Sequence, residues 1–274
     1  SDHITDQIKG LLHQCGGPNA ILSLDVFDTL LLRDDQSELR RFYDIGAEMA
    51  EIVAQMTTRP CTAQDAFAAR MLGTLASYRA GPKVQGCREG ALDDIHRVAS
   101  LMLMQSPAAT DRFIAAELRY ERAVLTPFAP LIALMAEHKA RGGRVLLLSD
   151  MYMRAPHIAE LLHGHGITAD QYDVLLSSAD TKISKASGLI FKEAEGRLGA
   201  QPEQFVHVGD APIGDVQKPK QNGWRSVHLP IPNQTLAARA DDHARMVQHV
   251  TTAYGFTLPY PAPPQPVYWP EAAE

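Results

Sequence analysis

Two aspartates, Asp25 and Asp28, interrupt a largely apolar stretch of this chain, the segment 21–32 with the sequence ILSLDVFDTLLL. The run from Ile21 to Leu24 has the length and composition of a strand that is buried on both faces of a parallel sheet. A carboxylate is almost never buried without a partner or a metal ion. A solvated turn after such a strand would favour Gly, Asn or Pro. The acidic pair therefore indicates a functional site at the end of this strand.

Polar residues also follow three later segments that have the character of buried strands. These segments, with the residues that end them, are 144–148 with Ser149, 172–176 with Ser177 and Ser178, and 204–208 with Gly209 and Asp210. In open α/β sheets, ligands bind in the crevice beyond the carboxyl ends of the strands. Asp25 and Asp210 would together offer the hard oxygen ligands that Mg²⁺ prefers. Ser149 and Thr29 offer hydroxyl groups to phosphate oxygens, and Lys185, at the start of a predicted helix, could reach back into the same crevice.

The elements that must position these residues alternate along the second half of the chain. Helical patterns at 131–139, 157–163, 189–198 and 216–222 alternate with the three strands named above and with a last strand at 224–229. This alternation is typical of a doubly wound parallel sheet that is covered by helices on both sides. Further helices are expected at 3–14 and, from apolar residues between 236 and 254, near the C-terminus.

The segment from about 36 to 125 has helical periodicity throughout and no strand-like alternation. Thr62 and Asp65 have the spacing of a capping box, and Ser106–Pro107 supplies an N-cap and a proline for a later helix. We therefore predict an α/β core at 1–32 and 127–232, an α-helical insert at 33–126, and a C-terminal helix with a Pro-rich tail at 233–274.

The bulk composition excludes several classes of protein. A hydrophobic content of 45% with 21% charged residues is ordinary for a globular protein. A net charge of -6 without a basic run disfavours binding to nucleic acid. Cys15, Cys61 and Cys87 lack the pairing and spacing of a disulfide framework or a zinc site. With no signal-peptide pattern and no apolar run of membrane-spanning length, we expect a cytoplasmic protein that does not bind membranes.

Four motifs in succession resemble those of the haloacid dehalogenase (HAD) superfamily of aspartate-nucleophile phosphotransferases. They are DVFDTL at 25–30, LLLS at 146–149, Lys185 within KASGLIF, and VGDAPIGD at 208–215. The helical insert falls between the first and second motifs, where many family members carry an α-helical cap. The resemblance therefore implies a Rossmann-like core with an inserted all-α cap.

The resemblance also implies roles for individual residues. Asp25 would attack phosphorus and form an aspartyl-phosphate, which divides one difficult step into two easier ones. The groups that would hold Mg²⁺ are the Asp25 carboxylate, the backbone carbonyl of Phe27 and Asp210, with Asp215 in support directly or through water. The residues that would hold the phosphoryl oxygens, where charge must be neutralised during transfer, are Thr29, Ser149 and Lys185.

Position 27 departs from the family pattern. Most phosphatases of the family carry a second Asp two residues after the nucleophile as the general acid/base, and this chain has Phe27 there. Asp28 could replace that group, or it could serve the turn through hydrogen bonds. Acid/base groups typically contribute about 10²–10⁴-fold to a rate. Without a replacement, hydrolysis of the aspartyl-phosphate would be slow or the chemistry would differ.

Relatives that act on carbon–halogen or carbon–phosphorus bonds also lack the second Asp. Asp210 argues against dehalogenation, because that reaction needs no metal ligand. Phosphonate chemistry needs a cap lysine for a Schiff base, and Lys83, the only lysine in the insert, has the surroundings of an exposed loop. Both reactions remain alternatives to phosphate transfer.

For several other polar residues, a structural or solvent-exposed role is weighed against a role at the site. Arg33, Arg40 and Arg41 could bind an anionic substrate from the cap, but a solvated face is the expected location. His207 is expected to be a strand histidine that faces a helix rather than a ligand. Asp150 and Tyr152 follow the second motif directly and are candidates for the wall of the crevice.

The predicted function is that of a Mg²⁺-dependent phosphohydrolase or phosphotransferase. Its substrate would be a small phosphorylated metabolite, since a cap that closes over the site excludes large polymers. The alternative is a catalytically weakened HAD-like domain with a regulatory or partner-binding role, to which the Pro-rich tail would be suited. Apolar faces of the cap helices could also pack against a second copy in a homodimer.

Overall fold

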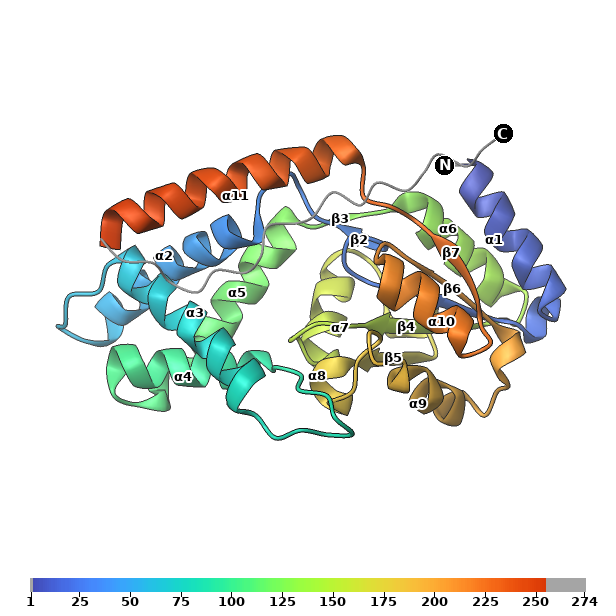
Figure 1. Ribbon diagram of the computed structural model, residues 1–274, viewed down its shortest axis with the longest axis horizontal. Coiled ribbons are helices and arrows are strands. Elements are labelled where there is room, and N and C mark those ends of the chain that lie inside the picture. The colour runs from blue at the N-terminus through green and yellow to red at the C-terminus, as the bar shows by residue number, and fades with distance from the viewer. Residues whose placement is uncertain (1, 255–274) are drawn as a thin grey trace.

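A five-stranded parallel sheet forms the centre of the molecule in the computed structural model, which describes residues 2–254 (Figure 1). Its strands, in the spatial order β5-β4-β1-β6-β7, are β5 (Val174–Ser177), β4 (Arg144–Ser149), β1 (Ile21–Leu24), β6 (Phe205–Gly209) and β7 (Arg225–His228). All neighbouring strands pair in parallel, so their carboxyl ends lie at one edge. β1 lies between β4 and β6, which places its carboxyl end at a topological switch point, the usual position of a ligand crevice in such sheets.

Helices cover both faces of this sheet, as the alternation predicted. Leu22, on one face of β1, belongs to a core formed with α1 (Asp2–Gln14), α6 (Ala129–Ala140) and α7 (Ala155–Gly164). Ile21, on the opposite face, belongs to a second core formed with α9 (Leu189–Leu198). Alternate residues of one strand thus enter different cores, which is why the strand sequence is apolar without interruption.

Some predicted boundaries in this region differ from the observed ones. The strand expected at 172–176 is observed at Val174–Ser177 and is followed by a single-turn helix, α8 (Ser178–Thr181). The helix expected at 216–222 is a π-helical segment at Pro212–Gln217 followed by the short α10 (Lys218–Gln221). A π-helical segment is rare and is often found at functional sites. No helix within residues 2–254 has the length and apolar character that crossing a lipid bilayer requires.

The α-helices of the insert lie beside the core (Figure 1). They are α2 (Glu38–Met56), α3 (Ala63–Ala80), α4 (Leu92–Met104) and α5 (Thr110–Val124). The capping box predicted for Thr62 and Asp65 is confirmed, with both reciprocal hydrogen bonds present. Ser106 caps a 3-10 turn that leads into α5, so the proline that follows it opens that turn rather than the α-helix itself.

A two-stranded antiparallel ribbon lies where the chain enters and leaves the insert. β2 (Leu31–Leu32) pairs with β3 (Thr126–Pro127). The sequence did not predict this ribbon, because two residues are too few for a period-two pattern to appear.

The C-terminal helix α11 (Asn233–Tyr254) lies along α2 and is bonded to the N-terminal end of α2 (Figure 1). Asp242 accepts hydrogen bonds from the backbone N–H and the hydroxyl of Ser37, at 3.0 and 2.8 Å. Arg40 donates to the other carboxylate oxygen at 2.8 Å. Burial alone would raise the pKa of Asp242, but the hydrogen bonds from Arg40 and Ser37 lower it to about 2. α11 therefore fixes the segment through which the chain enters the insert. The predicted Pro-rich tail lies outside the described residues.

Candidate active site

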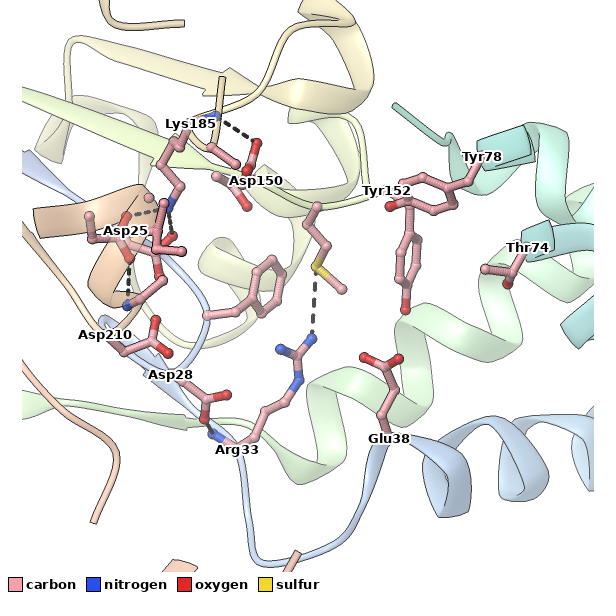
Figure 2. A pocket seen from close by; sticks show the side chains of 18 of the residues that line it. Asp25, Asp28, Arg33, Glu38, Thr74, Tyr78, Asp150, Tyr152, Lys185 and Asp210 are labelled. Atoms are coloured by element: carbon pink, nitrogen blue, oxygen red, sulfur yellow. Dashed lines mark hydrogen bonds and ion pairs between the residues drawn. The ribbon is translucent and has the colours of Figure 1, made fainter. Parts of the chain in front are cut away.

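A cavity of about 580 Å³ lies between the carboxyl edge of the sheet and the helical insert (Figure 2). The core contributes most of the charged groups together with one hydroxyl, and these residues are Asp25, Asp28, Ser149, Asp150, Lys185, Asp210 and Asp215. The insert contributes Glu38 and Phe42 from α2 and Thr74 and Tyr78 from α3. The cavity thus has a charged floor on the sheet and a mixed polar and aromatic roof on the helices.

Three carboxylates and one lysine share the floor of the cavity. One oxygen each of Asp25, Asp210 and Asp215 lies within 4.8 Å of the others. The ammonium group of Lys185 lies 2.6 Å from Asp25 Oδ1 and 2.6 Å from Asp215 Oδ1. Three carboxylates against one ammonium leave an excess of two negative charges when all are ionised. Such a set of hard oxygen donors fits a divalent cation such as Mg²⁺.

The pKa values of these carboxyl groups show the same imbalance. Burial raises the pKa of Asp25 to about 7, with Lys185 acting to lower it and Asp215 to raise it. Burial and the charges of Asp25 and Asp215 raise the pKa of Asp210 to about 8. Burial alone would raise the pKa of Asp215 too, but Lys185 and His207 hold it below its ordinary value. Asp215 is therefore the ionised partner of Lys185, while Asp25 and Asp210, whose pKa values are raised, are the carboxyl groups that a bound cation would stabilise most in their charged form.

Backbone hydrogen bonds position Asp25 and Lys185. The backbone N–H of Asp25 donates to the carbonyl of Val208 at 2.9 Å, which continues the pairing of β1 with β6 up to the site. Asp150 Oδ1 accepts from the backbone N–H of Lys185 at 3.1 Å. The residue after the second motif thus positions the lysine of the third.

Asp215 is held from behind by a buried polar chain. His207 Nε2 lies 2.9 Å from Asp215 Oδ1, and His207 Nδ1 lies 2.7 Å from the hydroxyl oxygen of Ser23. Burial lowers the pKa of His207, so the ring is neutral. A carboxylate only accepts, so Nε2 carries the proton and Nδ1 accepts from Ser23. His207 also faces Phe191 of α9, as the sequence led us to expect, but its contact with Asp215 was not foreseen.

Gly209 is required by the close approach of Asp215. A Cβ atom at position 209 would lie 2.4 Å from Asp215 Oδ2. The backbone N–H of Ala211 donates to this same oxygen at 2.9 Å. The glycine of the fourth motif therefore allows the carboxylate to fold back over its own strand.

Two predicted phosphate ligands occupy different positions. Ser149 lines the cavity, and its buried hydroxyl has no hydrogen-bond partner among residues 2–254. Thr29 is fully buried and is not part of the cavity wall, and its hydroxyl likewise has no hydrogen-bond partner among the described residues. Ser177 and Ser178, the polar ending of the edge strand β5, are not part of the wall either. Ser177 donates to the carbonyl of Met153 at 2.5 Å and so fixes the loop after β4.

Asp28 is engaged on all sides. It has a positive φ of 60°, which Asp adopts more readily than most residues, and its Oδ1 accepts from the backbone N–H of Arg33 at 3.1 Å. Arg239 of α11 donates to both carboxylate oxygens, at 2.8 and 3.1 Å. Burial alone would raise its pKa, but Arg239 and Arg33 bring the pKa of Asp28 below its ordinary value. These contacts support the second expectation, a role for Asp28 within the turn, and an ionised carboxylate has no proton to donate as a general acid. The replacement of the missing acid/base group by Asp28 stays a prediction.

Arg239 thus connects the C-terminal helix to the loop that carries the candidate nucleophile. Besides Asp28, it bonds the backbone carbonyls of Asp34 at 2.9 Å and Arg33 at 3.0 Å. We expect Arg239→Met to lower the free energy of unfolding by about 1.5–3 kcal/mol, the range for hydrogen bonds to charged groups. Urea denaturation measures this change. Arg245→Met, at an exposed position on the same helix, is the matched control and should cost less than about 0.5 kcal/mol. Equal losses in both variants would contradict the assignment.

The predicted exposure of two arginines is wrong. The side chains of Arg33 and Arg41 are 9% and 5% exposed. The guanidinium carbon of Arg33 lies 4.5 Å from the ring centroid of Phe27, and Arg33 lines the cavity. Arg40, which binds Asp242, is intermediate at 32% exposure. Lys83 is exposed and does not line the cavity.

A parallel α/β sheet that carries clustered carboxylates and a lysine at its carboxyl edge, beneath a helical insert, has the architecture of haloacid dehalogenase-like proteins. The family model described as haloacid dehalogenase-like hydrolase matches residues 21–223, and the chain belongs to this family. No curated protein sequence matches the chain.

Three solved structures are similar to this chain at low sequence identity. A 2-haloacid dehalogenase from Pseudomonas syringae pv. Tomato DC3000 superposes with a TM-score of 0.54 at 17% identity, covering 76% of this chain and 85% of that chain. A HAD phosphatase from Thermococcus onnurineus has a TM-score of 0.49 at 17% identity, covering 77% and 86%. A HAD family enzyme from Bacteroides thetaiotaomicron, in complex with magnesium and inorganic phosphate, has a TM-score of 0.48 at 15% identity, covering 76% and 93%. The first of these likenesses shows a common fold and does not identify a substrate.

Proposed function

We propose that this chain is a Mg²⁺-dependent hydrolase that removes phosphate from a small phosphorylated metabolite through an aspartyl-phosphate on Asp25. The observation that carries the proposal is the floor of the cavity, where Lys185 lies 2.6 Å from both Asp25 and Asp215. Asp210 completes the acidic cluster. This is the arrangement needed to gather a cation and a phosphoryl group around one nucleophilic carboxylate.

Each group has a task in this proposal. Asp25 attacks phosphorus, the bond from phosphorus to the leaving oxygen breaks, and that oxygen takes a proton from water as the alcohol or acid leaves. A second water molecule then hydrolyses the acyl phosphate, which releases inorganic phosphate and restores the Asp25 carboxylate. Lys185 and the unpartnered hydroxyl of Ser149 donate to the phosphoryl oxygens, and Thr29 is the remaining candidate donor. His207 and Gly209 position Asp215.

Mg²⁺ would be held by the Asp25 and Asp210 carboxylates and the backbone carbonyl of Phe27, with Asp215 in support. When bound, it would neutralise charge on the phosphoryl oxygens and on the attacking carboxylate. The acidic cluster fits this role because its own lysine leaves two negative charges unbalanced. A second candidate function is favoured by Phe27, which cannot transfer a proton, and by Asp28, which is bonded to Arg239. In this function the phosphorylated Asp25 is long-lived and the chain acts as a regulatory domain for a partner.

The test of this proposal is turnover of a panel of phosphomonoesters with and without Mg²⁺. Hydrolysis should require Mg²⁺ and should fall to background in EDTA, since no described side chain replaces the charge that the cation supplies. The cation should also raise the melting temperature, because it binds only the folded cluster. Asp210→Asn should abolish this rise, whereas Asp173→Asn, on the core surface, should preserve it. Full activity in EDTA, or release of halide from 2-haloacids in place of phosphate hydrolysis, would refute the proposal.

A further inference from the structure

Arg33 is the one described cation, besides Lys185, that lines the cavity. It follows β2 at the point where the chain enters the insert. Figure 2 shows its side chain extending into the cavity between Asp28 and Glu38. Its guanidinium group lies over the ring of Phe27, the residue that stands two positions after the candidate nucleophile. A substrate that has its phosphoryl group at Asp25 and extends toward α2 therefore passes Phe27 and Arg33.

The hydrogen-bonding capacity of Arg33 is not filled. Its Nη2 contacts Glu121 Oε2 at the long distance of 3.4 Å and Met151 Sδ at 3.8 Å. Its Nε is buried and has no hydrogen-bond partner within the part of the chain that the structure describes. A guanidinium group is always charged, and its planar fork of N–H donors matches the two oxygens of a carboxylate or phosphate. A buried side chain in this state indicates a missing acceptor.

The neighbouring carboxylates do not fill that need. Glu121 is fully buried and reaches Arg33 only through Oε2, at 3.4 Å; its Oε1 has no hydrogen-bond partner among the described residues and lies 3.7 Å from Arg41 Nε. Asp28 is occupied by Arg239. Glu38 lies farther out, 3.7 Å from Arg41, with a half-exposed side chain on the cavity wall.

We propose that Arg33 binds a second anionic group of the substrate, a carboxylate or a further phosphate, that is bonded within a few atoms of the scissile phosphoryl group. This inference rests on the proposed function, which places the phosphoryl group at Asp25 and Lys185. Phe27 lines the wall between the two anion sites, so the atoms that join the two groups pass along its ring. Glu38 lies beyond Arg33 and repels an anion on a longer chain, which restricts the spacer to a short one.

The test compares two matched ligands in the Asp25→Asn background, where binding is measured without turnover. Each ligand is an alkyl phosphate of two to four carbons, ending in a carboxylate in one series and in a hydroxyl group in the other. Calorimetric titration in the presence of Mg²⁺ should show at least tenfold tighter binding of the carboxylate series at the preferred length. Adding Arg33→Met should reduce this ratio to about one. Arg119→Met, at an exposed arginine of the same insert, should leave the ratio unchanged.

A second variant separates the ligand contact from folding. Arg33→Met leaves the buried Glu121 with Arg41, 3.7 Å away, as its remaining cation. The double variant Arg33→Met with Glu121→Gln removes both charges, and it should also bind the carboxylate and hydroxyl series with about equal affinity. Equal binding of the two series by the Asp25→Asn protein, or a tenfold preference that survives in both Arg33 variants, would overturn the proposal. Titration with inorganic phosphate and Mg²⁺ distinguishes failure of the proposed Arg33 site from failure of the proposed function. If phosphate binds and the series do not differ, only the Arg33 site is wrong; if neither phosphate nor either series binds, the proposed function fails as well.

Discussion

Replacing Asp25 by Asn is expected to reduce Mg²⁺-dependent phosphatase turnover by about 10⁴-fold or more, the scale seen when a catalytic nucleophile is removed. The substitution keeps the shape of the side chain and removes the oxygen nucleophile that forms the acyl phosphate. It also removes one of three crowded carboxylates, so the protein should fold at least as well as the unaltered chain. The loss is measured by steady-state kinetics with the best substrate of the panel.

Trapping the intermediate separates catalysis from binding. Intact-mass analysis after incubation with Mg²⁺ and beryllium fluoride or substrate should show an adduct on the unaltered protein and none on Asp25→Asn. Asp94→Asn, an exposed position on α4, is the matched control and should keep both turnover and adduct. Turnover of Asp25→Asn within tenfold of the unaltered protein would eliminate the aspartyl-phosphate route. An adduct without turnover would favour the regulatory alternative, in which Phe27 and the bonded Asp28 leave hydrolysis without an acid or base.

The location of the site followed from the sequence for a geometric reason. In a parallel sheet all carboxyl ends lie at one edge, so polar residues that end separate strands come together however far apart they are in the chain. Asp25, Ser149 and Asp210 meet around the central strand β1 for this reason. The same reasoning failed for Ser177, because β5 is the edge strand and its ending is too far from β1 to enter the cavity.

The supporting contacts around the site left no comparable signal. Arg239 and Asp28 are 211 residues apart, and nothing local in either segment predicts that they meet. Arg33 precedes two aspartates in a short polar run, and this composition indicates a solvated surface. Its burial depends on Phe27 and Glu121, which reach it only when the insert packs on the core. Periodicity predicts which face of an element is buried, but it does not predict which charged side chains find partners there.

A buried ionic cluster supports the roof of the cavity. Glu117 of α5 is fully buried and accepts from Arg70 Nε and Nη2 at 2.8 and 2.7 Å. His96 Nε2 lies 2.6 Å from Glu117 Oε2, the oxygen that also accepts from Arg70 Nε. Arg70 in turn lies 4.2 Å from the ring centroid of Phe42 and 5.2 Å from that of Tyr152, two residues of the cavity wall. Through Tyr152, which belongs to the loop after β4, the cluster connects α3, α4 and α5 to the core.

Glu117→Ala should therefore lower the free energy of unfolding by about 3–5 kcal/mol, because it leaves the buried guanidinium of Arg70 without its carboxylate. Urea denaturation at neutral pH measures this loss. The matched control is Glu48→Ala, whose ion pair with Arg119 is exposed and whose removal should cost no more than about 1 kcal/mol. A loss below about 1 kcal/mol for Glu117→Ala would mean that Arg70 finds another acceptor.

The pH dependence of stability provides an independent test of the same cluster. Burial alone would raise the pKa of Glu117, but Arg70 and His96 bring it well below its ordinary value of 4.5. The folded protein then binds fewer protons at this site than the unfolded chain does, so the contribution of Glu117 is complete above pH 4.5 and is lost as the pH falls further. Stability measured between pH 7 and pH 3 should decline more steeply below pH 4.5 for the unaltered protein than for Glu117→Gln, which has no proton to take up there. Parallel curves would show that the pKa of Glu117 is unchanged by folding, and the ionised carboxylate would then not be what joins the insert to the cavity wall.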